Sequence, residues 1–184
     1  MKLHFVLFTT AFLCASVATA DDHAMPLTST DIEHGSFMDK AQEFAGFGCT
    51  GDDQSPQLSW SGAPEGTKAF AVFAYDPDAP TGSGWWHWQL INIPADVTGL
   101  AAGVGSAESE DLPEGSQQMR NDYGNAAFGG ASPPPGDGAQ RYQYTEFALS
   151  QVLEIPADAS AALTGYMVNA NSLASATIEA LYKR

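Results

Sequence analysis

The sequence predicts a mainly β protein built from two packed antiparallel sheets, with short helices at its C-terminus. Three observations lead to this prediction: 18 Gly and 11 Pro are spread along 184 residues, three apolar runs have strand character, and the C-terminal part is rich in alanine and leucine. Dense Gly and Pro favour short strands joined by turns. We expect a single domain over residues 21–184, because that length suits one core and no repeat or long linker divides it.

Three runs are expected to form strands of the core. Residues 69–75 (AFAVFAY) are continuously apolar, which is typical of a strand covered on both faces. Residues 85–93 (WWHWQLINI) are aromatic and β-branched, and residues 142–149 (YQYTEFAL) make a third run of the same kind. The segments between them contain prolines that exclude regular structure.

The C-terminal part changes in character after Ser160, where alanine becomes frequent and proline no longer occurs. Asn171 or Ser172 could cap a helix there. The residues that recur at helical spacing behind this cap are Leu173, Thr177, Ile178 and Leu181. We therefore expect one or two short helices that pack on the β body.

The first twenty residues have the pattern of a secretory signal peptide. Lys2 supplies a positive start, residues 5–17 are largely apolar, and Ala18-Thr19-Ala20 forms a small-x-small cleavage pattern. We expect an exported protein, periplasmic or secreted after cleavage near Ala20, with no stable membrane anchor.

Charge and cysteine content exclude several classes of partner and bond. The formal net charge is −15, with 22 acidic and 7 basic residues, so the phosphates of nucleic acids would be repelled. Cys14 lies in the signal peptide and leaves Cys49 alone, which rules out an intramolecular disulfide. A lone cysteine is more often a small buried apolar residue than a reactive one. The oligomeric state stays open.

His87 is the first candidate for a functional side chain. Unlike His23 and His34, which lie in a polar N-terminal region, it stands in an aromatic run, Trp85-Trp86-His87-Trp88. Alternation along a strand predicts that Trp85 and His87 share one face, and that the other two tryptophans share the opposite face. Because a histidine on a buried strand is usually a satisfied core residue, this position alone does not establish a site.

The turn that precedes this strand adds a second candidate. Residues 76–80 (DPDAP) place two carboxylates directly after a core strand, in a loop that proline stiffens. Both could simply cap turn amides, which we expect for Asp78. Asp76, at the strand end, is the better candidate for a pocket. Further along, residues 123–142 are rich in glycine, whose backbone amides could approach a ligand closely.

These motifs occur in an order that resembles a known family. The segments are DPDAP, WWHW and GG-x-x-PPPGDG-x-x-RY at residues 129–142, with SPQLSWSGAPEGT at residues 55–67 upstream. Together they resemble the phosphatidylethanolamine-binding protein family, in its bacterial Raf-kinase-inhibitor-like branch. The resemblance implies a two-sheet β fold with one small pocket for phosphate-like anions or phosphoryl head groups.

The resemblance also implies which residues form the pocket. Carried over position by position, they are Asp76, Trp85, His87, Gly130, Pro133, Gln140 and Tyr142. One departure concerns Gln140, which stands where the family motif has a second histidine. Glutamine can donate an amide hydrogen bond but has no positive charge at any pH. A smaller departure is Asp53, where relatives more usually carry asparagine.

These inferences predict a non-catalytic binding protein. Its pocket would hold a small anionic or zwitterionic group such as a phospholipid head group, with His87 and backbone amides donating. Asp76 would orient His87 or accept an ammonium. The alternative is a module that inhibits or binds a protein target, such as a protease or other enzyme, through the loops at the pocket rim.

Enzymatic alternatives fit the sequence less well. No Gly-x-Ser-x-Gly motif occurs, and Asp76 and His87 have no evident nucleophile, although Ser83 and Ser132 lie in neighbouring motifs. The scattered histidines and the single cysteine do not have the spacing of metal ligands. We expect no catalytic residue, no metal and no cofactor.

Overall fold

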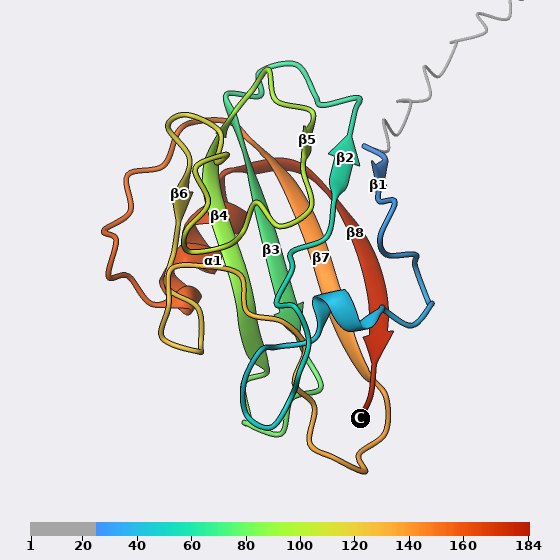
Figure 1. Cartoon of the computed structure of the whole chain (residues 1–184). Helices are drawn as coiled ribbons and strands as arrows, with labels where there is room; N and C mark the ends of the chain where they lie inside the picture. Colours follow the sequence, from blue (N-terminus) through green and yellow to red (C-terminus); the bar gives the residue numbers. More distant parts are fainter. Residues whose placement is uncertain (1–24) are drawn as a thin grey trace, which may run out of the picture.

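The computed structural model describes residues 25–184, which form two antiparallel sheets and one α-helix (Figure 1). The predicted fold class is thereby confirmed. The predicted signal peptide, residues 1–20, lies outside the described residues. None of the helices in residues 25–184 has both the length and the hydropathy that crossing a membrane requires.

The larger sheet has five strands in the order β6-β4-β3-β7-β8, all antiparallel to their neighbours. Its central strands are β4 (Trp85–Pro94), β3 (Ala69–Asp76) and β7 (Gln140–Leu149). They correspond to the three runs that the sequence predicts as core strands. The outer strands are β6 (Gln117–Gln118) and β8 (Ser172–Tyr182).

The smaller sheet consists of three short strands in the order β1-β2-β5. Their bounds are Leu27–Thr28 for β1, Leu58–Trp60 for β2 and Gly99–Leu100 for β5. A single 3-10 turn, η1 (Lys40–Gln42), lies between β1 and β2 along the chain.

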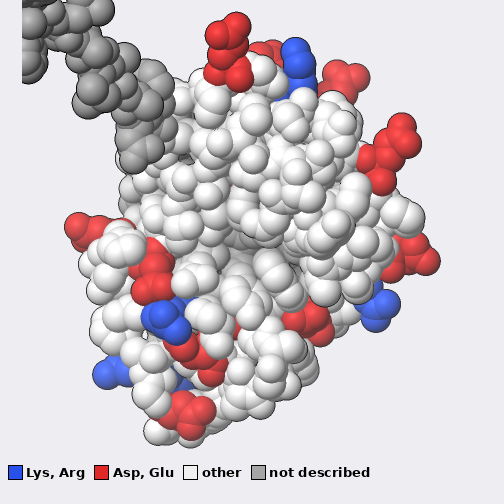
Figure 2. All heavy atoms as spheres, turned by 180° about the vertical axis from the view of Figure 1, so that it is seen from behind, with Lys and Arg blue, Asp and Glu red and all other residues white. Residues whose placement is uncertain are grey.

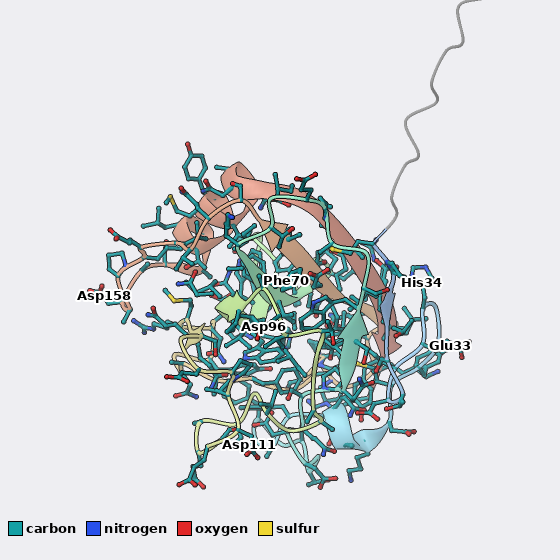
Figure 3. The ribbon with its side chains drawn as sticks, turned by 90° about the horizontal axis from the view of Figure 1, so that it is seen from above. Glu33, His34, Phe70, Asp96, Asp111 and Asp158 are labelled. Carbon is teal, nitrogen blue, oxygen red and sulfur yellow. The ribbon has the colours of Figure 1, made fainter. Side chains whose placement is uncertain are left out.

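The two faces of the five-stranded sheet bury separate apolar clusters. Between the sheets, Leu58 and Trp60 of β2 pack with Phe70 of β3 and other side chains of the large sheet. Phe70 is 2% exposed and lies near the middle of the view in Figure 3, whereas Glu33, His34 and Asp158 lie at its periphery. On the opposite face, a second cluster includes Phe73 and Phe147 together with α1 and the segment before it. Strand β3 is therefore covered on both sides, as its uninterrupted apolar sequence predicts.

Helix α1 (Ala161–Asn171) confirms one of the predicted C-terminal helices. The Ser160 hydroxyl caps its first turn by accepting a hydrogen bond from the Leu163 amide. The residues that α1 buries follow helical spacing and are small or β-branched: Ala161, Thr164, Gly165 and Val168.

The prediction of a helix over residues 171–181 is wrong, because these residues form strand β8. This strand pairs with β7 along nearly its whole length, from Gln140 opposite Tyr182 to Leu149 opposite Ser172. The more buried side chains of β8, Ala174, Ala176, Ile178 and Ala180, follow a period of two. Leu173, Thr177, Ile178 and Leu181 fit a helical spacing equally well. The local pattern fits both structures, and pairing with the exposed edge of β7 decides between them.

The prediction that side chains alternate strictly along the tryptophan-rich strand is also wrong. Tyr75 pairs with Trp86 while the adjacent Ala74 pairs with Trp88, so β4 has one extra residue, His87, at this point. Such a β-bulge breaks the alternation of side chains. As a result Trp88 packs between the sheets and Trp86 packs on the α1 face, instead of sharing one face.

Candidate functional site

A small pocket lies at the end of the large sheet where β3 ends and β4 and β7 begin, near the C-terminus (Figure 1). Its volume is about 160 Å³. Pockets that bury drug-sized ligands have roughly 300–1,000 Å³, so this one suits a group of a few non-hydrogen atoms. Twelve residues line it: Phe47, Asp76, Ala79, Pro80, Thr81, Trp85, His87, Tyr123, Ser132, Pro134, Gln140 and Tyr142.

Five of the seven predicted pocket residues meet in this cavity. Asp76 is the last residue of β3, Trp85 and His87 come from β4, and Gln140 and Tyr142 come from β7. Their role in binding stays a prediction.

Gly130 and Pro133 do not line the cavity; Ser132 and Pro134 take their places. Gly130 instead has a packing role, because a Cβ there would lie 2.5–2.6 Å from the backbone of residues 42–44. Its amide donates to Asp53 and its carbonyl accepts from Tyr123. The Pro133 carbonyl accepts a hydrogen bond from Nε of Arg184 at 2.9 Å.

Asp76 presents a carboxylate that is held by its own turn. Its Oδ1 accepts hydrogen bonds from the backbone amides of Asp78 at 2.8 Å and Ala79 at 3.1 Å. The side chain is almost fully buried, and burial raises its pKa to about 6, although the two amide bonds act in the opposite direction. Among the described residues no hydrogen bond of normal geometry uses Oδ2, although the Tyr142 hydroxyl lies beside the carboxyl group.

The expected roles of the two aspartates in this turn are partly reversed. It is Asp76 that caps the turn amides, whereas Asp78 forms a bidentate ion pair with the Arg141 guanidinium at 2.7 and 2.8 Å. Asp78 also accepts the Arg141 backbone amide. The hydrogen bonds from Arg141 lower the pKa of Asp78. This pair fastens the turn to the start of β7, outside the pocket.

His87 is buried, and a backbone carbonyl fixes its tautomer. Nδ1 lies 2.7 Å from the Gly129 carbonyl oxygen, so this nitrogen carries the proton and donates it. Burial lowers the pKa of His87 to about 4, against the opposing effect of the Gly129 and Gly130 carbonyls. At neutral pH the imidazole is therefore uncharged, and Nε2 can only accept. In the empty pocket His87 therefore does not donate through Nε2 at neutral pH, and Gly129 rather than Asp76 orients the ring; its role toward a ligand stays a prediction.

Aromatic rings form most of the remaining wall. The Tyr123 ring lies 5.2 Å from Trp85 and 5.7 Å from Phe47 between centroids, and the Tyr142 ring lies 5.2 Å from His87. Tyr123 lies in the glycine-rich segment, but neither Tyr123 nor Phe47 is among the residues that the sequence predicts for the pocket. The signal for Tyr123 was weak, because its ring reaches the site only through the fold of a long loop.

Two buried donors at this site make no hydrogen bond of normal geometry among the described residues: Nε1 of Trp85, which lies near the Tyr123 hydroxyl, and the hydroxyl of Tyr142. The Tyr142 hydroxyl lies beside the Asp76 carboxyl and slightly lowers its pKa, but does not reach normal hydrogen-bond geometry. Burial raises the pKa of Tyr142, which therefore stays protonated. Buried polar groups normally have a partner, so these donors indicate a site for an acceptor.

The C-terminal residue connects two loops of the rim. Arg184 bonds through Nε to the Pro133 carbonyl, and through Nη1 to the Phe47 carbonyl and the Cys49 sulfur. Cys49 is buried, as expected, and its Sγ lies 3.2 Å from the Ser132 hydroxyl. These contacts hold the loops that carry Phe47 and Ser132 against each other.

The charge at the pocket is that of a single carboxyl group. Among residues 25–184, no lysine or arginine lines it. The face of the molecule shown in Figure 2 carries scattered acidic residues with few basic ones between them. Within residues 25–184, no cluster of three or more His, Cys, Asp or Glu side chains is arranged to hold a metal ion.

Known proteins with similar sequences and structures support the fold described above. The similarity extends over the whole chain. A sequence model described as phosphatidylethanolamine-binding protein matches residues 28–183. UPF0098 protein YbcL of Escherichia coli is 48% identical over 184 residues, which cover 100% of this chain and 99% of that protein. UPF0098 protein YbhB of the same organism is 44% identical over 159 residues, covering 86% and 99%. The crystal structure of E. coli YbcL superposes with a TM-score of 0.85 at 50% identity, covering 87% of this chain and 98% of that one.

Proposed function

Because this chain belongs to the phosphatidylethanolamine-binding protein family, we propose that it is a non-catalytic binding protein whose pocket takes a small phosphoryl-bearing group. The observation that carries this proposal is the pair of buried donors that make no hydrogen bond of normal geometry among the described residues, the Tyr142 hydroxyl and Nε1 of Trp85, in a cavity of about 160 Å³. A phosphoryl group offers acceptor oxygens to both donors. The volume admits such a group and leaves the rest of a larger ligand outside.

Protonation of Asp76 determines when an anion fits. With a pKa of about 6, its carboxyl is charged at pH 8 and repels an anion. At pH 5 it is mostly neutral and offers a third donor. His87 stays neutral through this range, since its pKa is about 4. Anion binding should therefore follow the titration of Asp76 and not that of the histidine.

The contacts of the nearby nucleophiles support the non-catalytic part of the proposal. The Ser132 hydroxyl contacts the Cys49 sulfur at 3.2 Å, and among the described residues it makes no hydrogen bond to His87. A hydrolase of the serine type needs a nucleophile hydrogen-bonded to its base. Ser83 does not line the pocket; its carbonyl accepts from the Tyr75 hydroxyl.

The test uses dimethyl phosphate, a diester whose single negative charge does not change between pH 5 and pH 8. NMR titration should show at least tenfold tighter binding at pH 5, since the protonated share of Asp76 rises from about 1% to about 90%. Tyr142→Phe should weaken binding at pH 5 by about tenfold or more, because a hydrogen bond to a charged group contributes about 1.5–3 kcal/mol.

Absence of binding at both pH values would overturn the proposal. In that case the alternative, a protein-interaction module that uses the rim, becomes the better account. One observation favours it: Phe47 is 71% exposed at the mouth of the pocket, with a φ of 51° between two glycines. An exposed aromatic side chain held in this conformation is suited to contact a partner.

A further inference from the structure

We infer that the outer edge of β8 binds an extended, basic peptide segment of another protein, which adds to the five-stranded sheet as a further strand. The surface consists of the backbone edge at residues 175–177 and the groove that begins beside Ile178. It is separate from the pocket at the end of β3, β4 and β7, so the inference does not depend on the proposed function.

The first argument is that this edge has unpaired backbone groups. Strand β8 is the last strand of its sheet and pairs with β7 on one side. On the other side, residues 34–38 cover only its final part, through backbone hydrogen bonds to Glu179 and Leu181. Since backbone groups alternate in direction along a strand, those of Ser175 and Thr177 also face outward. Among the described residues these groups have no backbone partner.

The second argument is that the edge lacks the features that normally keep strand edges unpaired. Charged side chains, prolines and bulges provide this protection in most proteins. Residues 159–178 contain no charged residue, although the chain has 22 acidic and 7 basic residues. Strand β8 contains no proline, and its register with β7 shifts only near its first residue. Ser175 and Thr177 are exposed, so this part of the edge is accessible to another strand.

A groove lies next to this edge and gives an added strand side-chain contacts. Its volume is about 600 Å³, and it is lined by residues 27–34, Ser36, Phe37 and Ile178. Ile178 belongs to the apolar cluster between the sheets, and Leu27 packs against that cluster. When a peptide adds to a sheet edge, its main chain supplies affinity and its alternate side chains enter neighbouring pockets. The groove is placed to receive such side chains.

The charge of the groove favours a basic segment over a second copy of this chain. Asp31 and Glu33 line the groove, and Glu33 lies at the outside of the molecule in Figure 3. Among the described residues no lysine or arginine lines it, although Lys183 lies 5.4 Å from the Phe37 ring at one end. A second copy would bring the same acidic groups and the same net charge of −15 to the contact. Repulsion opposes that contact, whereas a basic segment is attracted.

The experiment titrates the protein at pH 7 with the peptide acetyl-KVKVK-amide, followed by NMR. The backbone amide signals of Ser175 and Thr177 should shift, and their hydrogen exchange should slow about fivefold or more when the peptide is bound. The signals of Asp76 and His87 should not move, because the peptide does not enter the pocket. A peptide that shifts the pocket signals, or that leaves both β8 amides unchanged, would overturn the inference.

Two further peptides separate charge from strand pairing. Acetyl-EVEVE-amide has the same length and the opposite charge, and should bind about tenfold more weakly or less. The KVKVK peptide with N-methyl groups on its three central residues keeps its charge but loses backbone donors on both of its edges. It should also bind about tenfold more weakly, since it cannot form the ladder of hydrogen bonds. Equal binding of the parent and the N-methylated peptide would contradict strand addition.

Two variants of β8 and one control locate the site on the protein. Thr177→Pro removes an outward amide that pairing with β7 does not use, and should weaken KVKVK binding about fivefold or more. Ser175→Lys leaves the backbone unchanged, adds a positive charge to the edge and should have an effect of similar size. Ala107→Lys makes the same change of charge at an exposed loop position between β5 and β6, and should change binding less than about twofold. Equal loss in both lysine variants would indicate general attraction to an acidic protein and overturn the inference.

The free protein tests the other possible occupant of the edge. Sedimentation should show a monomer, and the amides of Ser175 and Thr177 should exchange rapidly without peptide. A dimer in which these amides are protected would show that a second copy covers the edge, and would overturn the inference. Binding of dimethyl phosphate, present or absent, bears on the pocket alone.

Discussion

Burial raises the pKa of two carboxyl groups, that of Asp76 at the pocket and that of Glu146 in the core. The two groups differ in what surrounds them, and this decides whether the raised pKa points to a functional site. Asp76 lies at the end of β3, with one oxygen held by turn amides and burial raising its pKa to about 6. Glu146 lies in the middle of β7, opposite Val72 and Ala176, and is fully buried. Both of its oxygens lack a partner among the described residues, and burial raises its pKa to about 8.

The difference between the two lies in their surroundings. By alternation along β7, Glu146 points to the same face as Tyr144 and Ala148, into the apolar cluster between the sheets. Asp76 faces a cavity with buried donors and aromatic walls. A raised carboxyl pKa by itself therefore does not identify a functional site. Only Asp76 combines it with a space that a ligand can enter.

The largest expected effect is on Glu146. A carboxyl whose folded pKa exceeds its unfolded value favours folding at low pH, and this contribution is lost as the pH rises from about 4.5 through 8. Between pH 4.5 and pH 9 the loss amounts to as much as about 5 kcal/mol. Glu146→Gln should remove this part of the pH dependence and stabilise the protein at pH 9.

Urea unfolding of the parent and Glu146→Gln at pH 5, 7 and 9 measures the effect. Glu154→Gln, at an exposed position, is the matched control and should keep the pH dependence of the parent. If Glu146→Gln also keeps it, the core carboxyl does not titrate as described, and the contrast with Asp76 is lost.

A smaller effect of the same sign is expected for Asp76. Its folded pKa of about 6 exceeds the reference value of 3.8, so its ionisation destabilises the folded state as the pH rises through this window. Asp76→Asn keeps the turn hydrogen bonds and should raise the free energy of unfolding at pH 8 by about 1–3 kcal/mol. At pH 3 the variant and the parent should have equal stability. A variant that is less stable than the parent at pH 8 would show that the charged form is favoured in the empty pocket.

The smallest effect, with the opposite sign, is expected two residues further on. Arg141 lowers the pKa of Asp78, so this carboxylate stabilises the fold above its unfolded pKa, and the contribution is lost as the pH falls through the lowered value. Asp78→Asn should slightly lower the melting temperature at pH 7 and have no effect at pH 2. Because the pair is partly exposed, 1 M salt should reduce the difference. A difference that persists unchanged in high salt would mean that the turn, and not the ion pair, is responsible.

The sequence correctly predicted those strands and the helix whose residue pattern fits only one kind of secondary structure. The apolar run that became β3 and the aromatic run that became β4 are central strands, and the helix after Ser160 is present. The motifs also placed Asp76, His87 and Tyr142 in one pocket. The prediction for residues 172–182 failed because their apolar residues suit both a helix and a strand. Only pairing with strand β7 distinguishes the two structures.

By itself, the sequence determined the family, the fold class and five of the residues that line the pocket, because these depend on side-chain pattern and on motifs that are contiguous in the chain. Only the tertiary structure decided the chemistry of the site. The bulge at His87, the carbonyl of Gly129 that holds its proton and the burial that raises the pKa of Asp76 all arise from segments far apart in sequence. Protonation depends on solvent exclusion and on distances to partners, and folding alone sets both of these.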